Sequence, residues 1–224
     1  MTRRTGCGTF GMQKLDNNSE TLFDREIMRR CLTLAVESGK DSEYPFGAII
    51  TRAGEIVIES TSRVAHEHDV TRHAELIAIS KAQKLLGSTS LAECNLYSTS
   101  EPCALCAYAI RESRIGRVIY ALQAPLTGGR SKWNILSDAS LSESLPEVFD
   151  PPPEIVTGFM AEEVDRALFD WDRLVWGTIR RRGLFVPTPF ESVNQRIPGH
   201  PKNLLRTYFR LLRRMVFDRF GRTV

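Results

Sequence analysis

Two short groups of residues, about thirty positions apart, carry the side chains best suited to chemistry in this sequence. The first is His73-Ala74-Glu75 and the second is Pro102-Cys103-Ala104-Leu105-Cys106. A catalytic zinc ion takes three protein ligands, drawn from imidazole, thiolate and carboxylate, and keeps a fourth position for water. One imidazole and two thiolates make up that number. The spacing therefore predicts His73, Cys103 and Cys106 as the ligands of one zinc ion.

Glu75 is the candidate general acid and base. It lies two residues after His73, close enough to reach a water on the metal without being a ligand itself. Zinc lowers the pKa of a bound water to about 7, which makes that water a nucleophile near neutral pH. One carboxylate can then take the proton of the water and deliver it to the substrate. The two groups together predict a metal-assisted hydrolysis.

Two other uses of a Cys-x-x-Cys pair explain less of the sequence. A structural zinc site needs a fourth Cys or His ligand, and Cys94, nine residues before Cys103, lies in a predicted strand. A thioredoxin-like redox pair leaves His73 and Glu75 without a role. A catalytic zinc site is therefore the better interpretation.

The elements that must position these residues follow from the hydrophobic pattern. Helices are predicted over residues 21–39, from 72 or 73 to 86, over 103–112 and over 161–176, and strands over 46–51, 55–61, 94–99, 117–121 and 154–159. His73 and Cys103 then both stand near the start of a helix, where the helix N-terminus stabilises thiolates. Strands that alternate with helices are typical of an α/β layered domain.

Charge and composition divide the chain into three parts. We expect a flexible N-terminal arm over residues 1–20, a folded domain over 21–177, and a basic, helical C-terminal extension over 178–224. The extension has 11 basic and 2 acidic residues, which gives about +9 and leaves about −6 for the rest of the chain. Its helix either packs on the domain or on a partner subunit, or binds nucleic acid or phosphate.

The sequence also gives expectations about location. It has no run of 18 apolar residues, so we expect no membrane span. No apolar stretch follows Arg3 and Arg4, which argues against a secretory signal. The five cysteines are an odd number at irregular spacing and do not form a disulfide framework. These features favour a reducing, cytoplasmic location.

Beyond the zinc motif, residues from about Thr21 to Trp176 resemble the cytidine and deoxycytidylate deaminase superfamily, and most closely its bacterial guanine deaminase and tRNA-specific adenosine deaminase branches. Pro45-Phe46-Gly47-Ala48-Ile49 is similar to a run of the guanine deaminases. Residues 114–118, 127–128 and 101–103 are similar to stretches of the tRNA deaminases. The resemblance implies a three-layer α/β/α fold with a five-stranded mixed sheet, one zinc ion per subunit, and a homodimer whose partner helps to close the pocket.

The resemblance also implies an activity, which makes residues 21–177 a zinc-dependent deaminase domain. Such an enzyme is a hydrolase acting on the C–N bonds of cyclic amidines. It replaces an exocyclic amine of a nucleobase-like ring with oxygen and releases ammonia. Glu75 would pass the proton of the water to the ring nitrogen and then protonate the leaving ammonia.

The resemblance assigns the substrate side of the pocket to Phe46, Gly47, Ser62 and Ala74. Ser62 is a departure, because both branches carry here an Asn whose amide reads the base, and a hydroxyl cannot make a bidentate amide contact. Arg72 is a second departure, since it stands beside the zinc His in place of a small residue. Arg72 faces either the ring or an acidic group, or else solvent or a dimer partner.

The sequence favours a small-molecule substrate: a guanine-type base, which would belong to purine metabolism, another aminated heterocycle, or a cytosine-type base or nucleoside. The alternative is deamination of adenosine in tRNA, which needs a basic groove around the pocket to neutralise phosphates. The acidic body of the chain argues against that groove, although the basic extension could supply the charge. A non-catalytic zinc-binding module is a third possibility, and the presence of Glu75 argues against it.

Overall fold

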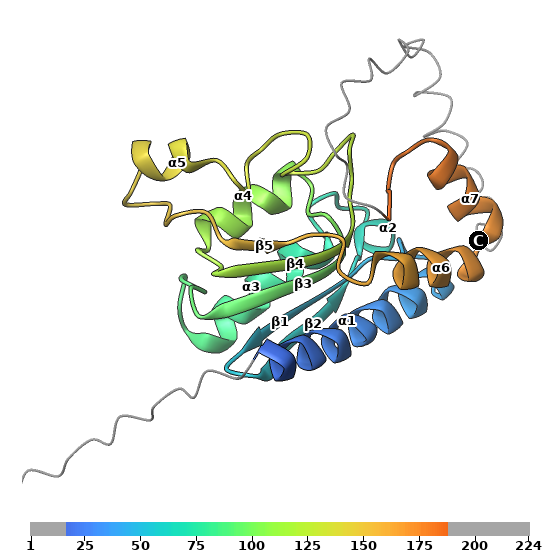
Figure 1. The fold of residues 1–224 in the computed structure, drawn as a ribbon, viewed down its shortest axis with the longest axis horizontal. Helices are drawn as coiled ribbons and strands as arrows, with labels where there is room; N and C mark the ends of the chain where they lie inside the picture. Colours follow the sequence, from blue (N-terminus) through green and yellow to red (C-terminus); the bar gives the residue numbers. More distant parts are fainter. Residues whose placement is uncertain (1–16, 188–224) are drawn as a thin grey trace, which may run out of the picture.

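The computed structural model describes residues 17–187, with side chains from Leu22 onward. Predictions for residues 1–16 and 188–224, which include most of the basic extension, lie outside this part of the chain. Within residues 17–187 a five-stranded sheet lies between two layers of helices (Figure 1). The fold is the three-layer α/β/α arrangement with a mixed sheet that the sequence predicts.

The sheet has the strand order β2-β1-β3-β4-β5. The strands are β1 (Gly47–Arg52), β2 (Glu55–Thr61), β3 (Cys94–Ser100), β4 (Arg117–Leu122) and β5 (Glu154–Val156). β1 pairs antiparallel with β2 and β3, whereas β3 and β4, and β4 and β5, are parallel. Because β1 runs against β3, it begins at the edge of the sheet where β3 and β4 end. We call this the site edge.

The helices form two layers that pack on separate apolar cores. One layer holds α1 (Asn17–Lys40), α6 (Ala161–Trp171) and α7 (Arg173–Arg181); the other holds α3 (Ala74–Leu86) and α4 (Ala104–Glu112); and α2 (Val64–Glu67) and α5 (Ala139–Ser144) are short helices in the connections. Figure 1 shows α1 and α6 side by side. Successive strand residues serve the two cores in turn: Ile49 faces α1, and Ile50 faces α3.

The prediction of one helix over residues 161–176 is wrong, because α6 and α7 are separate helices. Asp172 has an extended backbone with φ −150° and ψ 101°, and its carboxylate accepts the N–H groups of Leu174 and Val175. This is an N-cap, which begins a new helix and ends the old one. α7 continues through residue 177, where the sequence divides the domain from the basic extension, and buries Trp176 and Ile179 in the core.

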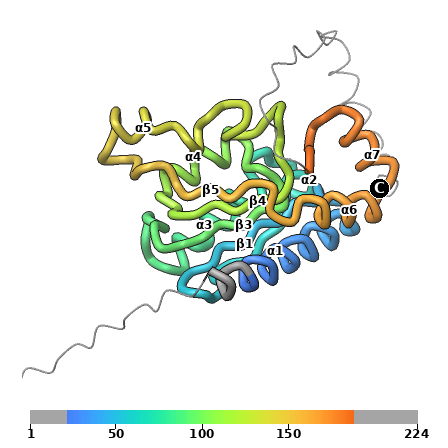
Figure 2. Tube along the Cα trace, viewed as in Figure 1, coloured from blue at the N-terminus to red at the C-terminus, as the bar shows by residue number. Residues whose placement is uncertain are grey.

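The long connection from β4 to β5 passes over α4 (Figure 2) and is held there by one buried arginine. The guanidinium of Arg111, on α4, donates to the carbonyls of Ile135, Asp138 and Asp150 and to the hydroxyl of Ser142 at 2.7–3.2 Å. Irregular backbone leaves many carbonyls without partners, and a guanidinium can satisfy several of them at once. Arg111 therefore holds the β4–β5 connection, whose only helix is the short α5, in one conformation.

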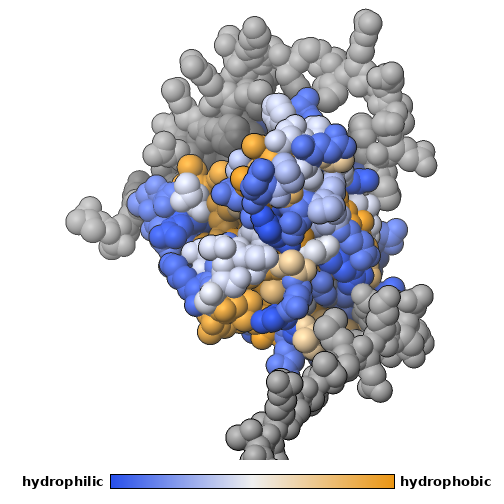
Figure 3. All heavy atoms as spheres, turned by 90° about the vertical axis from the view of Figure 1, so that its left-hand side faces the viewer, coloured by the Kyte–Doolittle hydropathy of each residue, from blue (hydrophilic) through white to orange (hydrophobic). Residues whose placement is uncertain are grey.

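The surface of the described part is mainly polar on the face that Figure 3 shows. Hydrophilic residues cover most of this face, and hydrophobic residues form separate smaller patches. Among the described residues, no helix is long and apolar enough to cross a membrane.

We predict that Arg111→Met costs about 3 kcal/mol in the free energy of unfolding, because it leaves several buried carbonyls without a donor. Urea unfolding measures this change. The control is Arg29→Met, which removes an exposed ion pair with Glu163 and should cost less than about 1 kcal/mol. Equal losses in the two variants would contradict the role given to Arg111.

Candidate metal centre and active site

Three predicted metal ligands meet where two helices begin at the site edge. His73 is the N-cap residue of α3, and Cys103 is the N-cap residue of α4. Both have extended backbones, with φ −66° and ψ 149° for His73 and φ −67° and ψ 174° for Cys103. Neither side chain caps its own helix, so both are free to turn toward each other. Cys106, in the first turn of α4, completes the group.

The spacing of the three ligand atoms fits a tetrahedral zinc ion. The two Sγ atoms are 3.6 Å apart, and Nδ1 of His73 is 3.5 Å from Sγ of Cys103 and 3.4 Å from Sγ of Cys106. Tetrahedral zinc, with bonds of about 2.3 Å to sulfur and about 2.0 Å to nitrogen, separates two sulfurs by about 3.8 Å and sulfur from nitrogen by about 3.5 Å. The donor set of one nitrogen and two sulfurs also suits zinc. The three residues can therefore hold this metal.

The electrostatics of the group favour at least one thiolate. Hydrogen bonds from Cys106 and then from His73 lower the pKa of Cys103 to about 4. The same contact with Cys103, together with burial, raises the pKa of Cys106. Both sulfurs lie at the N-terminus of α4, whose free N–H groups stabilise negative charge. The centre thus provides thiolate to a cation.

Glu75 lies beside this group in the first turn of α3. Its side chain is buried, and burial raises its pKa. Oε1 accepts a hydrogen bond from the hydroxyl of Ser98 at 3.0 Å, and Oε2 lies 3.6 Å from Sγ of Cys106. One oxygen is therefore held by β3 while the other faces the metal ligands. The carboxylate has the position that the sequence predicts for a proton carrier that is not a ligand.

Ser98 is a residue that the sequence interpretation missed. It is fully buried in β3, on the face that packs against α3. The signal was present in the strand Cys94–Ser100, where polar residues stand among buried positions. The role of Ser98 comes from its hydrogen bond to Glu75, which lies 23 positions earlier. No local sequence pattern links the two residues.

A second buried carboxylate, Glu101, shapes the loop that covers Cys103. It accepts the N–H groups of Ala124, Arg130 and Ser131 at 2.6–2.9 Å. Gly128 pairs with Cys103, and a Cβ at Gly128 would lie 2.3 Å from the carboxylate of Glu101. The loop therefore needs both the glycine and the carboxylate to lie against the metal centre.

The four residues predicted to bind substrate lie near one another at the site edge. The N–H of Ser62 donates to the carbonyl of Phe46 at 3.1 Å, and Ser60 donates to the carbonyl of Ala74 at 2.6 Å. Gly47 follows Phe46 at the start of β1, where a Cβ would lie 2.5 Å from a backbone oxygen of α1. Close packing is thus one reason for this glycine. Contact of these four residues with a substrate stays a prediction.

Arg72 points to acidic groups of its own loop. Its guanidinium lies 2.7 Å from Glu67 and 3.5 Å from Asp69, and its side chain is about half exposed. Of the alternatives that the sequence left open, the structure places Arg72 beside acidic side chains at the surface.

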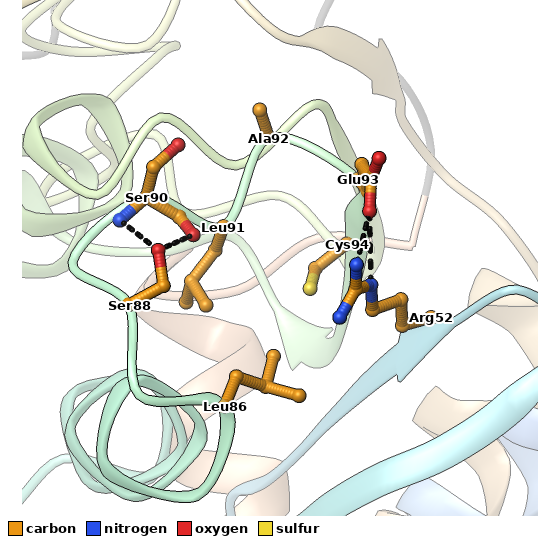
Figure 4. Close-up of a pocket in the computed structure, with 8 residues that line it drawn as sticks. All are labelled: Arg52, Leu86, Ser88, Ser90, Leu91, Ala92, Glu93 and Cys94. Carbon is orange, nitrogen blue, oxygen red and sulfur yellow. Dashed lines mark hydrogen bonds and ion pairs between the residues drawn. The ribbon is translucent and has the colours of Figure 1, made fainter. Parts of the chain in front are cut away.

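A cavity of about 370 Å³ lies away from this centre, at the other end of α3 (Figure 4). Its lining includes Arg52 and Glu93, which form an ion pair with each other, and Ser88, whose hydroxyl bonds to the backbone of Ser90. The polar groups of this cavity are thus largely used within the protein, and they do not face the metal ligands.

We predict that Cys103→Ala weakens zinc binding by more than about 100-fold, because it removes one of three ligands. Metal analysis after dialysis measures the zinc that each variant retains. The matched control is Cys94→Ala, which removes a buried thiol outside the centre and should keep zinc at the wild-type level. Zinc retained by Cys103→Ala, or lost from Cys94→Ala, would contradict this assignment.

Comparisons with known proteins agree with this geometry. Residues 22–122 match the model of the cytidine and deoxycytidylate deaminase zinc-binding region. The chain is 37% identical over 129 residues to the tRNA-specific adenosine deaminase of Aquifex aeolicus, which covers 57% of this chain and 85% of that protein. It is 41% identical over 98 residues to the guanine deaminase of Bacillus subtilis, which covers 43% of this chain and 63% of that protein.

A solved structure from a study of A-to-I editing by tRNA:A34 deaminases has a similar fold. It matches with a TM-score of 0.57 and 30% identity over 64% of this chain and 99% of that one. The chain spans only 26% of the tRNA(Ile)-lysidine synthase of Deinococcus radiodurans, to which it is 34% identical over 161 residues, or 71% of this chain. With the His-Cys-Cys centre and the matched region in agreement, the chain belongs to the cytidine and deoxycytidylate deaminase family.

Proposed function

We propose that this protein is a zinc-dependent hydrolytic deaminase of a nucleobase-like ring, with one zinc ion per subunit. One observation carries the proposal. A buried carboxylate, Glu75, lies beside a group of three ligand atoms within 4.8 Å of one another. A structural zinc site has no need of a carboxylate that is held next to the metal ligands but is not one of them. Family membership supports the same chemistry.

The residues of the chain divide the reaction between them. Zinc held by His73, Cys103 and Cys106 would supply a water of lowered pKa. Oε2 of Glu75, the oxygen not bonded to Ser98, takes a proton from this water and gives it to the ring nitrogen. The oxygen adds to the carbon that bears the amine. The hydroxyl now on that carbon gives its proton back to Glu75, and Glu75 passes this proton to the amine. The C–N bond breaks, ammonia leaves, and the carbon–oxygen bond becomes a carbonyl.

We propose a small base or nucleoside as the substrate, with a guanine-type base first. The Phe46-Gly47 run, which is similar to that of guanine deaminases, lies at the site edge beside Ser62. The cations of the adjoining loop have acidic partners: Arg63 lies 3.8 Å from Glu67, and Arg72 lies 2.7 Å from the same residue. These arginines therefore add little net charge for binding phosphates.

The same proposal includes a homodimer in the cytoplasm. The family resemblance supports the homodimer. The four described cysteines form no disulfide with one another, which is compatible with a reducing location.

We predict that the protein releases ammonia from at least one member of a panel of aminopurines, aminopyrimidines, aminotriazines and their nucleosides. Glu75→Gln should lower kcat by at least about 100-fold, because general acid–base catalysis is lost. The control is Glu67→Gln, a partly exposed carboxylate of the neighbouring loop, which should keep wild-type activity. Ammonia release is measured with an enzyme-coupled assay. Equal activity of Glu75→Gln and wild type would contradict the role given to Glu75. A zinc-loaded wild type that neither releases ammonia from the panel nor forms inosine in tRNA would favour a non-catalytic zinc-binding module.

Deamination of adenosine in tRNA is the second candidate function, and the tRNA-specific relatives favour it. It predicts that the protein converts adenosine to inosine in tRNA and binds tRNA with an affinity that falls steeply with salt. Replacement of four arginines of the extension by Gln should then flatten the salt dependence: Arg206, Arg210, Arg213 and Arg214. Inosine formation with no release of ammonia from the small-molecule panel would reverse the order of the two candidates.

A further inference from the structure

Hydrogen bonds join the two ends of the loop that leads into the metal centre. It runs from Ser62 to Arg72, between β2 and α3, and His73 follows directly. Just before the loop, Ser60 donates to the carbonyl of Ala74 at 2.6 Å. Within it, the N–H of Arg63 donates to the carbonyl of Arg72 at 2.9 Å. The first residues of this loop therefore lie next to the backbone that carries His73, and we call residues 62–66 the wall.

A single buried carboxylate holds the wall from behind. Glu43 lies in the connection between α1 and β1, and its side chain is 1% exposed. It accepts the N–H groups of Ala65 and His66 at 3.0–3.1 Å, the hydroxyl of Ser62 at 3.2 Å, and the N–H of Tyr44 at 2.9 Å. Nδ1 of His66 lies 3.1 Å from the same carboxylate. Four donors from Ser62, Ala65 and His66 thus converge on one side chain.

These contacts favour the charged form of Glu43. Burial alone would oppose ionisation, but the N–H bonds from Tyr44, His66 and Ala65 outweigh it and hold the pKa of Glu43 below its ordinary value. Charge-assisted hydrogen bonds are about twice as strong as neutral ones. The hydrogen bonds to Glu43 therefore hold the wall more firmly than the hydrogen bonds within the short helix α2 could alone.

The same network changes the role of Ser62. Its hydroxyl donates a hydrogen bond to Glu43 and accepts one from the N–H of Val64 at 3.4 Å. Only 2% of the residue is exposed. A hydroxyl used in this way has no proton to offer an incoming ring. Ser62 thus joins the wall to Glu43, and its hydroxyl is not available to donate a hydrogen bond to a substrate.

We infer that Glu43 is a positioning residue of the substrate pocket, which holds the Ser62–His66 wall beside His73 without touching the reacting atoms. The inference rests on the proposed function, because it assigns the wall to the substrate side of the same centre. Loss of Glu43 loosens the wall but leaves the metal ligands and Glu75 in place. It therefore weakens substrate binding more than the chemical step.

The test uses Glu43→Gln in the full chain, which keeps the shape of the side chain but turns one acceptor oxygen into an N–H₂ donor facing N–H groups. Steady-state kinetics should show KM raised at least about ten-fold, with kcat within about three-fold of wild type. Zinc content should not change. Hydrogen–deuterium exchange should show faster exchange in peptides that cover residues 62–66 and unchanged exchange at the start of α4.

The matched control is Asp24→Asn. Asp24 is also a buried carboxylate with several donors, since it accepts hydrogen bonds from Tyr97 and Arg117, but it belongs to α1, on the other face of the sheet. We expect the Asp24→Asn variant to have a lower free energy of unfolding and an unchanged KM. If Glu43→Gln fails to fold, Glu43→Asp withdraws both oxygens from the wall while keeping the charge, and should give the same split between KM and kcat.

Three outcomes would overturn the inference. They are a KM unchanged in the Glu43 variant, a kcat that falls by as large a factor as KM rises, and the same KM rise in Asp24→Asn. Failure of the proposed function gives a different result, namely no ammonia release by the zinc-loaded wild type. In that case the exchange experiment still decides whether Glu43 holds the wall: unchanged exchange over residues 62–66 would reject it.

Discussion

The requirement that three ligand atoms from two helices converge on one point governs this structure. His73 begins α3 and Cys103 begins α4, so both helices must start at the same edge of the sheet. α4 does so because it follows β3 and leads into the parallel strand β4, which places its N-terminus beyond the end of β3. α3 does so because it runs back across the sheet before β3 begins. The order of strands and helices thus places the first turns of α3 and α4 at the same edge of the sheet, whether or not a metal is bound.

Buried carboxylates hold the irregular loops around the metal centre in place. They fall into two groups, which differ in the number of backbone N–H groups that each carboxylate accepts. Glu43 and Glu101 each accept three backbone N–H groups, which no helix or strand would satisfy, and so fix the loops on either side of the metal ligands. Glu75 accepts one hydroxyl and keeps an oxygen for the ligand side. A carboxylate with both oxygens bonded to backbone N–H groups fixes a loop, whereas Glu75 keeps Oε2, in contact with the Cys106 thiol, on the side of the predicted metal ligands.

The sequence was sufficient to predict that His73, Cys103 and Cys106 form one group, which the structure brings together, because few residue types bind zinc and their spacing is short. Three ligands of the right type at the starts of two helices leave few other interpretations. Ser98 and Glu43 could not be found in this way, because each acts through a partner about twenty positions distant that only the folded chain brings near. The break at Asp172 did have a local signal, since Asp is a favoured N-cap, but the apolar period across it concealed the new helix.

The family match ends at residue 122, but the folding unit does not. Trp176 is fully buried in the core under α1, and its ring stacks with that of Phe185. Phe185 in turn lies 5.4 Å from the ring of Phe46, and Gln123 exchanges two backbone hydrogen bonds with Val186 at the end of β4. Segments beyond the matched region therefore help to place Phe46, one of the residues predicted to bind substrate. The region matched by the family model contains the His-Cys-Cys group and Glu75, which supports the same type of reaction as in the relatives. On the proposed function, the determinants of the substrate should then be sought in the Ser62–His66 wall and in residues 184–187, because both pack against Phe46.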